Sequence, residues 1–549
     1  MNTLTIGIDT EDNAGQPTIY ALAHALGFKS WTAGAVGQDD LIRELNKLAQ
    51  SFDAVNIWCL NLPYDLVNLF GELMPDILTV YLARRRIVGA QLKGQSKVKF
   101  FALERFLPKI NLAKIGKMVG LEKLEIEFNE KRCIRDAQIA ARAGDRISRE
   151  MQRMKIPLRF SPVAGALAAF HAEAGSKLPV CDERVRGAGK DALYGGRTET
   201  YYIGYWPETK GQLFYFDFRA AHAKAMLELL PDYTSFNWTD KPEETFYLAD
   251  VLVEVTPWHG MGTLPYHDHD RGLIFPVGTF RGTYTDEDLK GPNIKVLKYY
   301  GALNFPRAGR YLKHFTKKLI PTPMDNPINR ALKKGIYTGM SGKFSQRSEI
   351  SFFMDWEKAK PADFWNGIML GDWVLANRKG PTPRHSNFVW SAYITAKCRR
   401  MQRQLYEAIF KEGGKVLYGD TDSGLACLDS VMRAKRLLAN FDAELSMKEI
   451  TEARIFSPKM YVFRDKEGVN HISAKGIPGR LHDQIAEGHL ELEADQPGTF
   501  WELLKANAAN RMTGLKNSWV RKSYTVNSNF KSRILPRRGP WTAPVVMTY

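Results

Sequence analysis

The alternation of apolar and polar residues predicts strands and helices in mixed order along the first part of the chain. Residues 3–9 (TLTIGID) alternate as in a strand and end in an acid, and residues 54–60 (AVNIWCL) form a short apolar run typical of a buried strand. Residues 41–52 have apolar positions at helical spacing, and residues 133–154, rich in Ala, Arg and Ile, predict a long helix. This order indicates a βαβ-like first domain.

The same reading of the remaining chain predicts a second domain. Residues 184–197 (RVRGAGKDALYGGR) are glycine-rich and basic, which favours a hinge. Beyond it, residues 212–218 (QLFYFDF) and 415–420 (KVLYGD) are strand-like. Residues 326–344 predict a helix with an early proline and a glycine-rich exit. Residues 391–414 predict a long helix that ends at a glycine pair and leads directly into the strand at 415–420.

Length and charge narrow the classes of protein to which the chain can belong. Its 549 residues exceed what one hydrophobic core usually holds, so we expect two or more domains. The net charge of +17 indicates a polyanionic partner, nucleic acid before an acidic membrane surface. Apolar runs are too short to span a membrane, and the N-terminus is unlike a signal peptide, so we expect no membrane partner.

Basic residues are concentrated toward the C-terminus. No acid follows Glu502, whereas nine basic residues do: Lys505, Arg511, Lys516, Arg521, Lys522, Lys531, Arg533, Arg537 and Arg538. Aromatic residues are interleaved with them: Trp519, Tyr524, Phe530 and Trp541. A solvated basic face would need no such aromatics, so this composition favours a groove that follows a nucleic-acid strand. The five cysteines are scattered, which argues against a disulfide framework and a zinc ribbon. We therefore expect the protein in a reducing cytosol.

Two acids one residue apart, Asp420 and Asp422, interrupt the apolar stretch KVLYGDTDSGLA. Like charges this close repel, so a positive partner is expected there. An EF-hand loop is excluded, because its sixth and twelfth positions would be Leu425 and Val431. Two alternatives remain open on this segment alone. One is a phosphatase of the haloacid type, and the other is a phosphoryl-transfer site in which carboxylates hold two metal ions.

A two-metal site needs a further aspartate from elsewhere in the fold, and Asp217 is the candidate. It lies at the end of the apolar strand 212–218 and precedes a helix-compatible segment. In the helix predicted at 326–344, Arg330 and Lys334 are four residues apart, so both face one side and could hold a triphosphate.

With these residues in place, the chain resembles family B DNA polymerases over nearly its whole length. YGDTDS (418–423) matches the palm motif Y-x-D-T-D-S without change. FDFRAAHAKAM (216–226) resembles the palm motif D-x-x-S-L-Y-P, and KGIYTGMSGKF (334–344) resembles the fingers motif K-x-x-x-N-S-x-Y-G. PKMYVF (458–463) resembles the K-x-Y motif, and LYGGR (193–197) resembles the Y-x-G-G linker, with Leu in place of its first Tyr. Five motifs in the family's order are hard to obtain by chance.

The resemblance extends to a 3′–5′ proofreading exonuclease in the N-terminal region. Asp9 and Glu11 resemble its first motif, D-x-E, and lie on one face of a strand. NLPYD resembles the second motif and supplies Asp65, and RCIRD resembles the third and supplies Asp136. Arg132 stands where the third motif has Tyr. Singly, each acid could be a helix cap or a solvated residue; together they favour the nuclease.

The resemblance implies an α/β multidomain (α+β) architecture: an RNase H-like 3′–5′ exonuclease domain followed by a right-hand polymerase domain with palm, fingers and thumb. We expect the exonuclease domain at residues 1–185 and the polymerase domain at 186–549. The parts expected within the polymerase domain are the palm at about 190–320 and 390–470, the fingers at about 321–350 and the thumb at about 475–549. The chain is short for the family and resembles its protein-primed phage members, which carry two insertions, here expected at about 285–326 and 347–388.

The resemblance also implies roles for individual residues. Asp217 and Asp422 would bind two Mg²⁺ ions in the polymerase site, with Asp420 in support. The exonuclease acids, Asp9, Glu11, Asp65 and Asp136, would bind two more, and Mn²⁺ could substitute. Arg330 and Lys334 would hold the triphosphate of a dNTP. The residues expected to contact primer-template DNA are Lys459, Tyr461, Lys475, Gly195 and Gly196, and a terminal protein primer is a candidate partner.

Departures from the family pattern surround the nucleotide pocket. His222 replaces the Tyr of the first palm motif, and Ser341 replaces the Tyr of the fingers motif. Ala220, Thr338 and Gly339 are further replacements, whereas all of the metal-ligand acids are kept. Intact acids argue against the alternative of a nucleic-acid-binding protein with a decayed catalytic site. The protein is expected in the cytoplasm, that of the host cell if the chain is phage-encoded.

Overall fold

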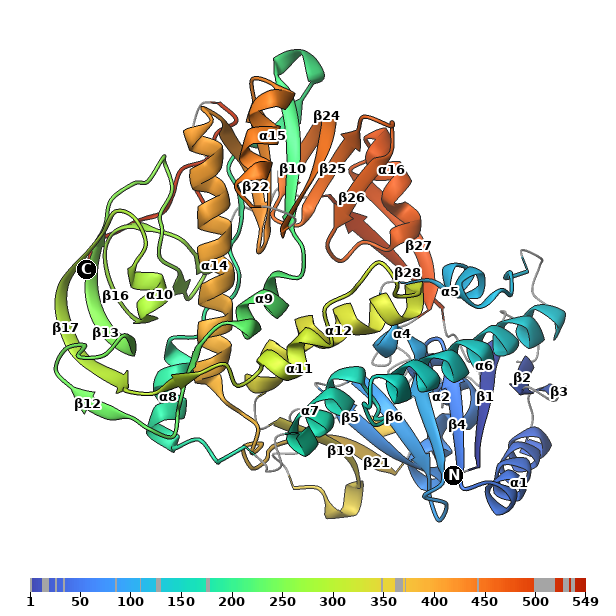
Figure 1. Cartoon of the computed structure of the whole chain (residues 1–549). Helices are drawn as coiled ribbons and strands as arrows, with labels where there is room; N and C mark the ends of the chain where they lie inside the picture. The colour runs from blue at the N-terminus through green and yellow to red at the C-terminus, as the bar shows by residue number, and fades with distance from the viewer. Residues whose placement is uncertain are drawn as a thin grey trace.

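Large β-sheets joined by long helices form the frame of the molecule in the computed structural model (Figure 1). The residues that the structure describes are 2–11, 19–24, 27–32, 35–83, 86–108, 110–124, 130–173, 178–346, 349–360, 369–370, 372–441, 444–497, 519–526, 533–534 and 539–549. An N-terminal sheet, a central sheet and a flanking sheet are the largest, and α-helices fill the space between them.

The N-terminal sheet has an RNase H-like strand order. Its described strands are β1 (Thr3–Glu11), β2 (Ile19–His24), β3 (Gly27–Thr32), β4 (Ala54–Cys59), β5 (Leu78–Ala83), β6 (Arg86–Leu92) and β7 (Val98–Ala102). They lie in the order β3-β2-β1-β4-β7-β6-β5, with β1, β4 and β7 parallel and β1-β2-β3 an antiparallel meander. The fold predicted for this region is confirmed.

Helices cover this sheet and connect it to the rest of the chain. They are α1 (Ala35–Ser51), α2 (Leu62–Phe70), α3 (Met74–Ile77), α4 (Leu103–Phe106), α5 (Leu112–Val119), α6 (Glu130–Arg153), α7 (Pro162–Glu173) and α8 (Glu183–Asp191), with the 3-10 turn η1 (Gly71–Leu73). The long helix α6 lies directly on β1. A Cβ at Gly7 would be 1.8 Å from the carbonyl oxygen of Ala137, so glycine allows this close approach.

The central sheet carries the segments expected to form the palm. Its described strands are β8 (Thr198–Thr200), β9 (Gly204–Trp206), β10 (Gln212–Phe218), β22 (Lys415–Asp420), β23 (Ser423–Leu428), β24 (Leu445–Ser457), β25 (Met460–Asp465) and β26 (Asn470–Ala474). The order is β26-β25-β24-β10-β23-β22-β8, and β9 pairs with β24. Its hydrogen bonds join neighbours in antiparallel register, so β10 lies between β23 and β24.

Short elements surround the central sheet. They are η2 (Glu208–Lys210), α9 (Ala221–Leu227), α15 (Val431–Ala439), η5 (Gly479–Leu481), α16 (His482–Glu487) and the antiparallel hairpin of β27 (Glu491–Pro497) and β28 (Trp519–Thr525). The hairpin and α16 belong to the region expected to be the thumb. In Figure 1 they lie beyond β26, on the side of the central sheet that faces the N-terminal unit.

The flanking sheet comes from the segment between β10 and α12 (Pro327–Phe344) and from the C-terminus. Its described strands are β12 (Asn237–Thr239), β13 (Phe246–Val255), β16 (Val277–Thr285), β17 (Ile294–Phe305) and β29 (Val546–Met547), in the order β12-β17-β13-β16-β29. Smaller elements beside it are β11 (Leu230–Pro231), β14 (Tyr266–Asp268), β15 (Gly272–Ile274), α10 (Asp286–Leu289), β18 (Ala308–Gly309) and α11 (Lys313–Lys317). The first expected insertion, about 285–326, therefore contains one long strand of the flanking sheet, β17, whereas β12, β13 and β16 come earlier in the chain.

The C-terminal segment does not stay with the hairpin expected to form the thumb. β29 pairs in parallel with β16 of the flanking sheet, and the amide of Ile203 donates to the carbonyl of Pro540 over 2.9 Å. Trp541 packs edge-on against Tyr202 with their ring centroids 5.3 Å apart. The last described residues therefore hold the flanking sheet against the central one.

The helix α12 has the predicted early proline, is capped by Asn326, and crosses between the N-terminal unit and the central sheet (Figure 1). After it come β19 (Glu349–Asp355), η3 (Trp356–Lys358), β20 (Met369–Leu370) and β21 (Trp373–Lys379), a small antiparallel sheet within the second expected insertion. The long helix α14 (Phe388–Lys411) follows and leads into β22, as predicted. One hydrophobic cluster joins residues of α6, α12 and α14, including Ile147, Ile336 and Ile394.

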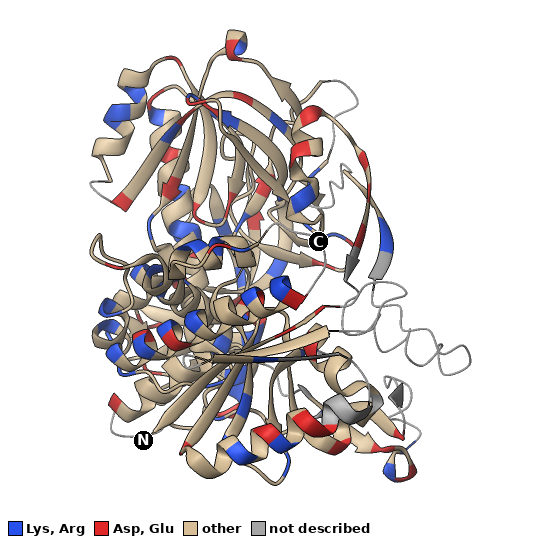
Figure 2. Ribbon diagram, turned by 90° about the vertical axis from the view of Figure 1, so that its right-hand side faces the viewer, with Lys and Arg blue, Asp and Glu red and all other residues tan. Residues whose placement is uncertain are grey.

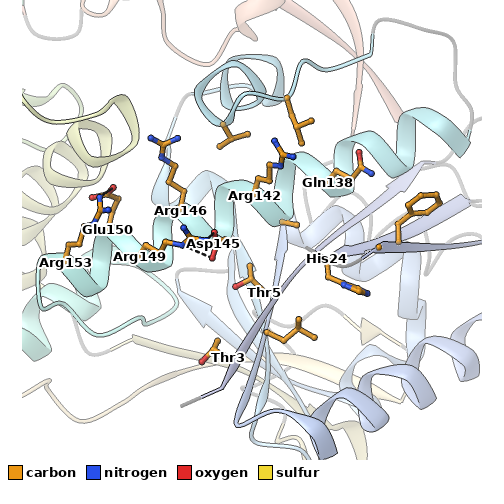
Figure 3. A pocket seen from close by; sticks show the side chains of 16 residues that line it. Thr3, Thr5, His24, Gln138, Arg142, Asp145, Arg146, Arg149, Glu150 and Arg153 are labelled. Atoms are coloured by element: carbon orange, nitrogen blue, oxygen red, sulfur yellow. Dashed lines mark hydrogen bonds and ion pairs between the residues drawn. The ribbon is translucent and has the colours of Figure 1, made fainter.

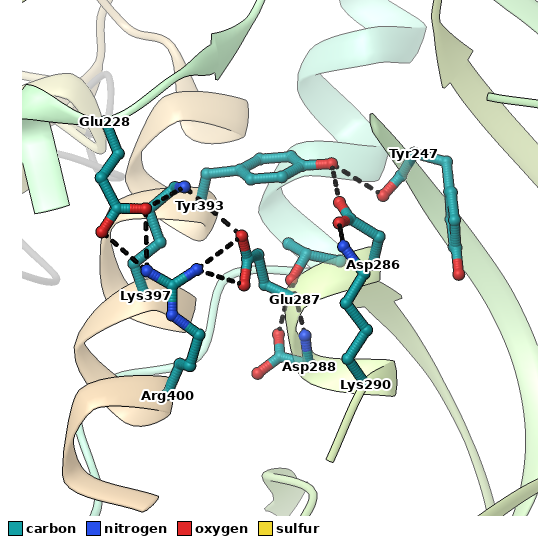
Figure 4. Close-up of polar contacts among 10 residues, drawn as sticks. Glu228, Tyr247, Asp286, Glu287, Asp288, Lys290, Tyr393, Lys397 and Arg400 are labelled. Atoms are coloured by element: carbon teal, nitrogen blue, oxygen red, sulfur yellow. Dashed lines mark hydrogen bonds and ion pairs between the residues drawn. The ribbon is translucent and has the colours of Figure 1, made fainter. Parts of the chain in front are cut away.

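A largely buried network of charges fixes α14 against α10, beside the flanking sheet, and against the end of α9 (Figure 4). Arg400 of α14 makes ion pairs with Glu228 at 2.7 Å and with Glu287 at 2.8 Å, and Lys397 pairs with the same two acids. Tyr393 donates to Asp286 over 2.7 Å. Removing one member would leave a buried charge without its partner, so these contacts specify one arrangement of the three elements.

A second arginine of α14 extends this network to the interdomain linker. Both side chains of the Arg399–Asp288 pair are almost fully buried, and their two hydrogen bonds measure 2.9 Å. The same guanidinium donates to the carbonyls of Tyr194 and Gly195 over 2.7 and 2.9 Å. The linker backbone is therefore held by α14, which also leads into the D-T-D hairpin.

Charged residues of both signs are distributed over the molecule. Figure 2 shows basic and acidic residues interspersed on the helices and on the outer hairpin, so the excess of positive charge is not confined to the C-terminal region. Across the described part of the chain, no helix combines the length and the apolar character needed to cross a bilayer.

Candidate active sites

Backbone pairing in the central sheet brings two acids from distant parts of the sequence together. Asp217, near the end of β10, is paired with Ser423 on one side and Ser446 on the other. The amide of Phe218 donates to the carbonyl of Asp422 over 2.9 Å. Asp217 and Asp422 therefore lie side by side, as the sequence predicts.

The interdomain linker holds the turn that carries Asp422. The amide of Thr421 donates to the carbonyl of Arg197, and the amide of Asp422 donates to the carbonyl of Asp420, each over 2.6 Å. A Cβ at Gly196 would lie 2.5 Å from the side chain of Thr421, so glycine lets the linker approach the turn this closely. The Y-x-G-G segment thus supports the D-T-D turn.

Left-handed backbone conformations gather at this site. Among the described residues, six that are not glycine have positive φ, and three of them surround the palm acids: Ala220 at 56°, Thr421 at 59° and Lys459 at 62°. Such conformations cost free energy and persist where the surrounding structure enforces them, as often happens at active sites. The strain supports a functional role for this edge of the sheet.

Burial and mutual repulsion perturb the palm acids. Burial, followed by the charges of Asp217 and Asp420, raises the pKa of Asp422 to about 7. Burial raises the pKa of Asp217 as well, and the nearby Lys334 opposes that shift. A divalent cation would offset this repulsion, and carboxylate oxygens are the ligands that Mg²⁺ prefers, so the two aspartates fit a metal site.

The third acid, Asp420, already has protein partners. It accepts hydrogen bonds from the hydroxyls of Thr198 and Thr421 over 2.8 and 3.0 Å, and the ammonium group of Lys459 lies 3.4 Å away. These contacts agree with the supporting role expected for Asp420.

The fingers helix α12 places one of its two expected phosphate ligands near the acids. The charge of Lys334 acts on both Asp217 and Asp422. Arg330, one turn earlier, is exposed and donates to the carbonyl of Asp325 over 3.3 Å at the start of the helix. Lys334 is therefore close enough to the palm acids to affect their pKa. Arg330 lies on the same face of α12 as Lys334, but at the far end of that face, near the start of the helix.

The sequence reasoning missed Tyr337, a buried residue of the same helix. Burial, followed by the charges of Asp422 and Asp217, raises the pKa of its hydroxyl to about 12. It follows Lys334 by three residues and precedes Ser341 by four, so all three lie on one face of α12. That spacing is the signal that could have identified it.

The two residues that replace the family's tyrosines lie in buried surroundings. His222 belongs to α9, directly after the strand that carries Asp217, and burial lowers the pKa of its imidazole. Ser341 is buried in α12; its hydroxyl donates weakly to the carbonyl of Thr338 over 3.4 Å, and its own carbonyl accepts from Ser391 over 2.6 Å. Both side chains are smaller than the tyrosines they replace.

The residues expected at the primer end lie on the strands next to the palm acids. The amide of Lys459 donates to the hydroxyl of Tyr418 over 3.0 Å, and the ring of Tyr461 packs 5.0 Å from that of Tyr418. Lys475 is tied to the same place, because its amide donates to the carbonyl of Lys459 over 3.0 Å. The structure thus brings Lys459, Tyr461 and Lys475 together beside Asp420.

A second acidic cluster lies at the end of β1. Carboxylate oxygens of Asp9, Glu11 and Asp136 are within 4.8 Å of one another, the arrangement expected of a metal site. Asp65 is adjacent, but its carboxylate accepts from the amide and the hydroxyl of Thr10 over 3.1 and 2.9 Å. Three of the four predicted exonuclease acids therefore form the cluster, and Asp65 supports it from α2.

The acids of this cluster interact strongly. Burial, and then the charges of Asp65, Asp136 and Glu11, raises the pKa of Asp9 well above its ordinary value. Burial raises the pKa of Asp65 to about 8, although hydrogen bonds from Thr10 oppose that shift. In the described part of the chain, one buried oxygen of Asp9 and one of Asp136 lack a hydrogen-bond partner. Such unsatisfied oxygens fit a divalent cation.

Two basic side chains neutralise the cluster from its rim. Arg132, which stands where the family has Tyr, lies 3.0 Å from Glu11. Lys123 lies 3.1 Å from Asp136, and sequence reasoning missed it because it falls outside the acidic motifs. Burial raises the pKa of Glu11 and of Asp136, and these cations act against both shifts.

The structure describes only some of the residues expected to form a basic C-terminal groove. The prediction that Arg533 contributes to this groove is wrong. Its side chain is buried, 3.4 Å from Glu199 and hydrogen-bonded to the backbone of Thr542. Arg521 is exposed and pairs with Glu493 at 2.8 Å. Several predicted members lie outside the described residues: Lys505, Arg511, Lys516, Phe530, Lys531, Arg537 and Arg538.

The raised pKa of Asp422 gives a pH-dependent stability without metal. The folded chain keeps this proton up to pH of about 7, whereas an unfolded aspartate loses it near pH 4, so stability falls as the pH rises through that window. We expect Asp422→Asn to be more stable than wild type at pH 8 in EDTA, by roughly 1–3 kcal/mol, and equal at about pH 3. Urea unfolding measures the difference.

Controls separate this effect from general surface charge. Asp429→Asn removes an exposed charge from the end of the same hairpin and should change stability by less than about 0.5 kcal/mol. Saturating Mg²⁺ at pH 8 should stabilise wild type more than Asp422→Asn, because the ion binds the folded state. Equal stability of Asp422→Asn and wild type at both pH values would contradict the repulsion.

Part of the chain matches a known protein family, and its fold matches solved structures. Residues 130–364 match the family model described as DNA polymerase type B, organellar and viral. No curated protein sequence matches the chain. Among solved structures, phi29 DNA polymerase with primer-template DNA and incoming nucleotides matches with a TM-score of 0.70 at 13% identity, over 96% of this chain and 99% of that one.

Two further structures of phi29 DNA polymerase agree. The complex with single-stranded DNA gives a TM-score of 0.69, and the binary primer-template complex gives 0.70, each at 13% identity over 96% of this chain and 100% of that chain. At this identity the likeness concerns the fold, and it confirms the predicted architecture of the whole chain. The family match over residues 130–364, the fold shared with phi29 DNA polymerase and the unchanged Y-x-D-T-D-S motif all agree with the resemblance to family B DNA polymerases.

Proposed function

We propose that nucleotidyl transfer takes place at the end of β10, where Asp217 and Asp422 meet. The observation that carries this proposal is the pairing of β10 with β23, which holds the two carboxylates side by side at an edge of strained backbone. Two Mg²⁺ ions, or Mn²⁺ in their place, would supply Lewis acidity at the α-phosphate and at the primer hydroxyl when bound there. Asp217 and Asp422 would hold them, and Asp420 would orient the turn.

The remaining side chains have roles that follow from their positions. Lys334 carries positive charge toward the acids and would neutralise the triphosphate of a dNTP, with Arg330 farther along the same helix face. Lys459 and Tyr461, beside Asp420, would hold the primer end. Lys475 is tied to Lys459 through its backbone and would contact DNA from the same side.

The N-terminal cluster supports a second activity, 3′–5′ removal of nucleotides. Asp9, Glu11 and Asp136 would hold divalent metal, which would supply the activated water of such a site. Asp65 would orient Thr10 and act on Asp9 by its charge. Lys123 would balance the charge of the emptied cluster and would face a phosphate when the acids bind metal.

Primer-template DNA is the partner that this proposal requires, and the phi29 DNA polymerase of the same fold has been observed with it. A protein primer is a finer proposal, supported by the shared fold and by a flanking sheet inserted between the palm and fingers segments. Incorporation of labelled nucleotide onto a candidate terminal protein, without any oligonucleotide, would test it. The alternative of a decayed catalytic site is disfavoured, because Asp217 lies beside Asp422 and Asp9 lies beside Glu11 and Asp136.

Loss of a palm acid should separate the two activities. We expect Asp422→Ala to reduce primer extension by at least about 1,000-fold, because a lost metal ligand removes several kcal/mol of charge stabilisation. Degradation of single strands by the same variant should stay near wild type. Gel-based extension and degradation with Mg²⁺ measure both, and Asp429→Ala is the control for a nearby acid. Extension by Asp422→Ala at the wild-type rate would remove the site from this hairpin.

Changes in the N-terminal cluster should have the reverse effect. Asp9→Ala should abolish degradation of a labelled single strand and leave extension intact. Arg132→Tyr removes the cation that neutralises Glu11, so we expect degradation to rise by about tenfold. Lys131→Tyr, an exposed neighbour, is the control. If neither wild type nor Arg132→Tyr degrades DNA, the domain is a DNA-binding scaffold alone.

The smaller side chains around the nucleotide should weaken selection against ribonucleotides. Histidine at 222 leaves more room than tyrosine and can hydrogen-bond a 2′-hydroxyl. We expect His222→Tyr to improve discrimination between dNTP and rNTP, by up to roughly 100-fold. Single-nucleotide extension gives the ratio of kcat/KM for each. Strong rejection of rNTP by wild type, unchanged in His222→Tyr, would assign the selection to another residue, with Tyr337 as the first candidate.

A further inference from the structure

An open cleft with a basic wall lies between α6 and the edge of the sheet formed by the start of β1, the end of β2 and the start of β3 (Figure 3). Its volume is about 860 Å³. One wall is the polar face of α6, and the other comes from β1, β2 and β3 with a contribution from α5. The polar side chains that matter here are Thr3, Thr5, His24, Gln138, Arg142 and Arg146.

Four arginines recur on one face of α6. Arg142, Arg146, Arg149 and Arg153 follow one another at intervals of four, three and four residues, so all face the cleft. Over the helix they extend for about 16 Å at 1.5 Å per residue. A polyanion lying in the cleft could therefore meet several of them at once.

The arginines differ in how far the protein neutralises them. Arg149 pairs with Asp145, and Arg153 pairs with Glu150. Arg146 makes one long contact, 3.4 Å to the carbonyl of Met118, and Arg142 has no acidic partner among the described residues. The arginines outnumber the acids of the cleft by two, and the neutral threonines and glutamine add donors. The wall suits phosphate oxygens.

This cleft is separate from the exonuclease cluster, although α6 contributes to both. Asp136 points toward the end of β1, where it meets Asp9 and Glu11. The cleft instead borders Thr3 and Thr5 at the beginning of β1. An anion bound there would therefore not touch the residues of either proposed active site.

An exposed aromatic residue completes the binding surface. Phe28 of β3 lines the cleft and is 53% exposed. Beside a row of cations, an exposed aromatic ring offers a platform on which an unpaired base can stack. Free phosphate or an acidic peptide would use the arginines without needing Phe28.

The cleft ends next to the fingers helix. Glu150, which pairs with Arg153, also accepts from the side-chain amide of Asn326 over 2.8 Å. Asn326 is the N-cap of α12, the helix that carries Lys334. A strand in the cleft would thus run along α6 toward the start of the fingers.

We propose that this arginine cleft binds single-stranded DNA outside both active sites. Arg142 and Arg146 contact backbone phosphates, Arg149 and Arg153 extend the basic path, and Phe28 stacks on a base. The site anchors unpaired template or displaced strand and takes no part in the chemistry. It adds to the affinity of the enzyme for long single strands through charge and stacking together.

Binding of a fluorescein-labelled oligo-dT in EDTA, measured by anisotropy over a range of NaCl concentrations, tests the proposal with the full chain. Each phosphate contact to a single strand contributes about 0.7 to the slope of log affinity against log salt. Arg142→Gln with Arg146→Gln should therefore lower that slope by up to about 1.4. Phe28→Ala should weaken binding by about 5- to 100-fold and leave the slope unchanged.

The control removes two cations elsewhere in the same domain. Arg43 and Lys47 are exposed on α1 and do not line the cleft, so Arg43→Gln with Lys47→Gln should leave the slope at its wild-type value. Thermal unfolding of each variant confirms that it folds, and extension of a short primer-template should stay unchanged. A slope equal to that of the control, or unaltered affinity in Phe28→Ala, would overturn the proposal. An acidic protein as the true occupant would give the first of these results.

Discussion

The repulsion between Asp217 and Asp422 is the constraint on which the polymerase half of the molecule depends. Two partly buried carboxylates side by side are unfavourable, and side-chain contacts alone would not keep them there. The antiparallel pairing of β10 with β23 fixes their separation through backbone hydrogen bonds, which cannot relax without breaking the sheet. The linker then secures the turn, because the carbonyl of Arg197 accepts from the amide of Thr421. The strained backbone at Thr421 is stable because these neighbours enforce it.

The buried charges around α14 also help to hold the D-T-D turn beside Asp217. Arg399 holds the linker by two of its carbonyls and holds α10, which directly follows β16 of the flanking sheet, by Asp288, while α14 itself leads into the D-T-D hairpin. Shifting the flanking sheet would therefore move the linker, and the linker contacts the turn through Gly196. Such a network is weak evidence for stability but strong evidence for a specified geometry, since each buried charge has a defined partner. The position of the D-T-D turn is thus linked, through α14, to the linker and to Asp288 beside the flanking sheet.

Local patterns in the sequence predicted much of the fold and most of the site. The alternation in 212–218, the helix before the D-T-D strand and the acidic motifs each depend on neighbouring residues, and the structure places them as expected. Features that depend on distant pairing were missed. Nothing near Val546 indicates that β29 joins β16, and nothing near Arg533 indicates a buried partner at Glu199. Tyr337 and Lys123 were missed because their roles arise from tertiary proximity rather than from a motif.

The two acidic sites differ in how the protein compensates the repulsion among their carboxylates. At the N-terminal cluster, Arg132 and Lys123 form ion pairs with Glu11 and Asp136, so much of its charge is balanced by the protein itself. At the palm, Lys334 is the cation that acts on both Asp217 and Asp422 among the described residues, and it belongs to a helix of another subdomain. The palm acids therefore keep part of their mutual repulsion, which a bound cation can relieve. Metal and nucleotide then complete a charge balance that the palm leaves open, whereas at the N-terminal cluster metal must compete with cations already in place.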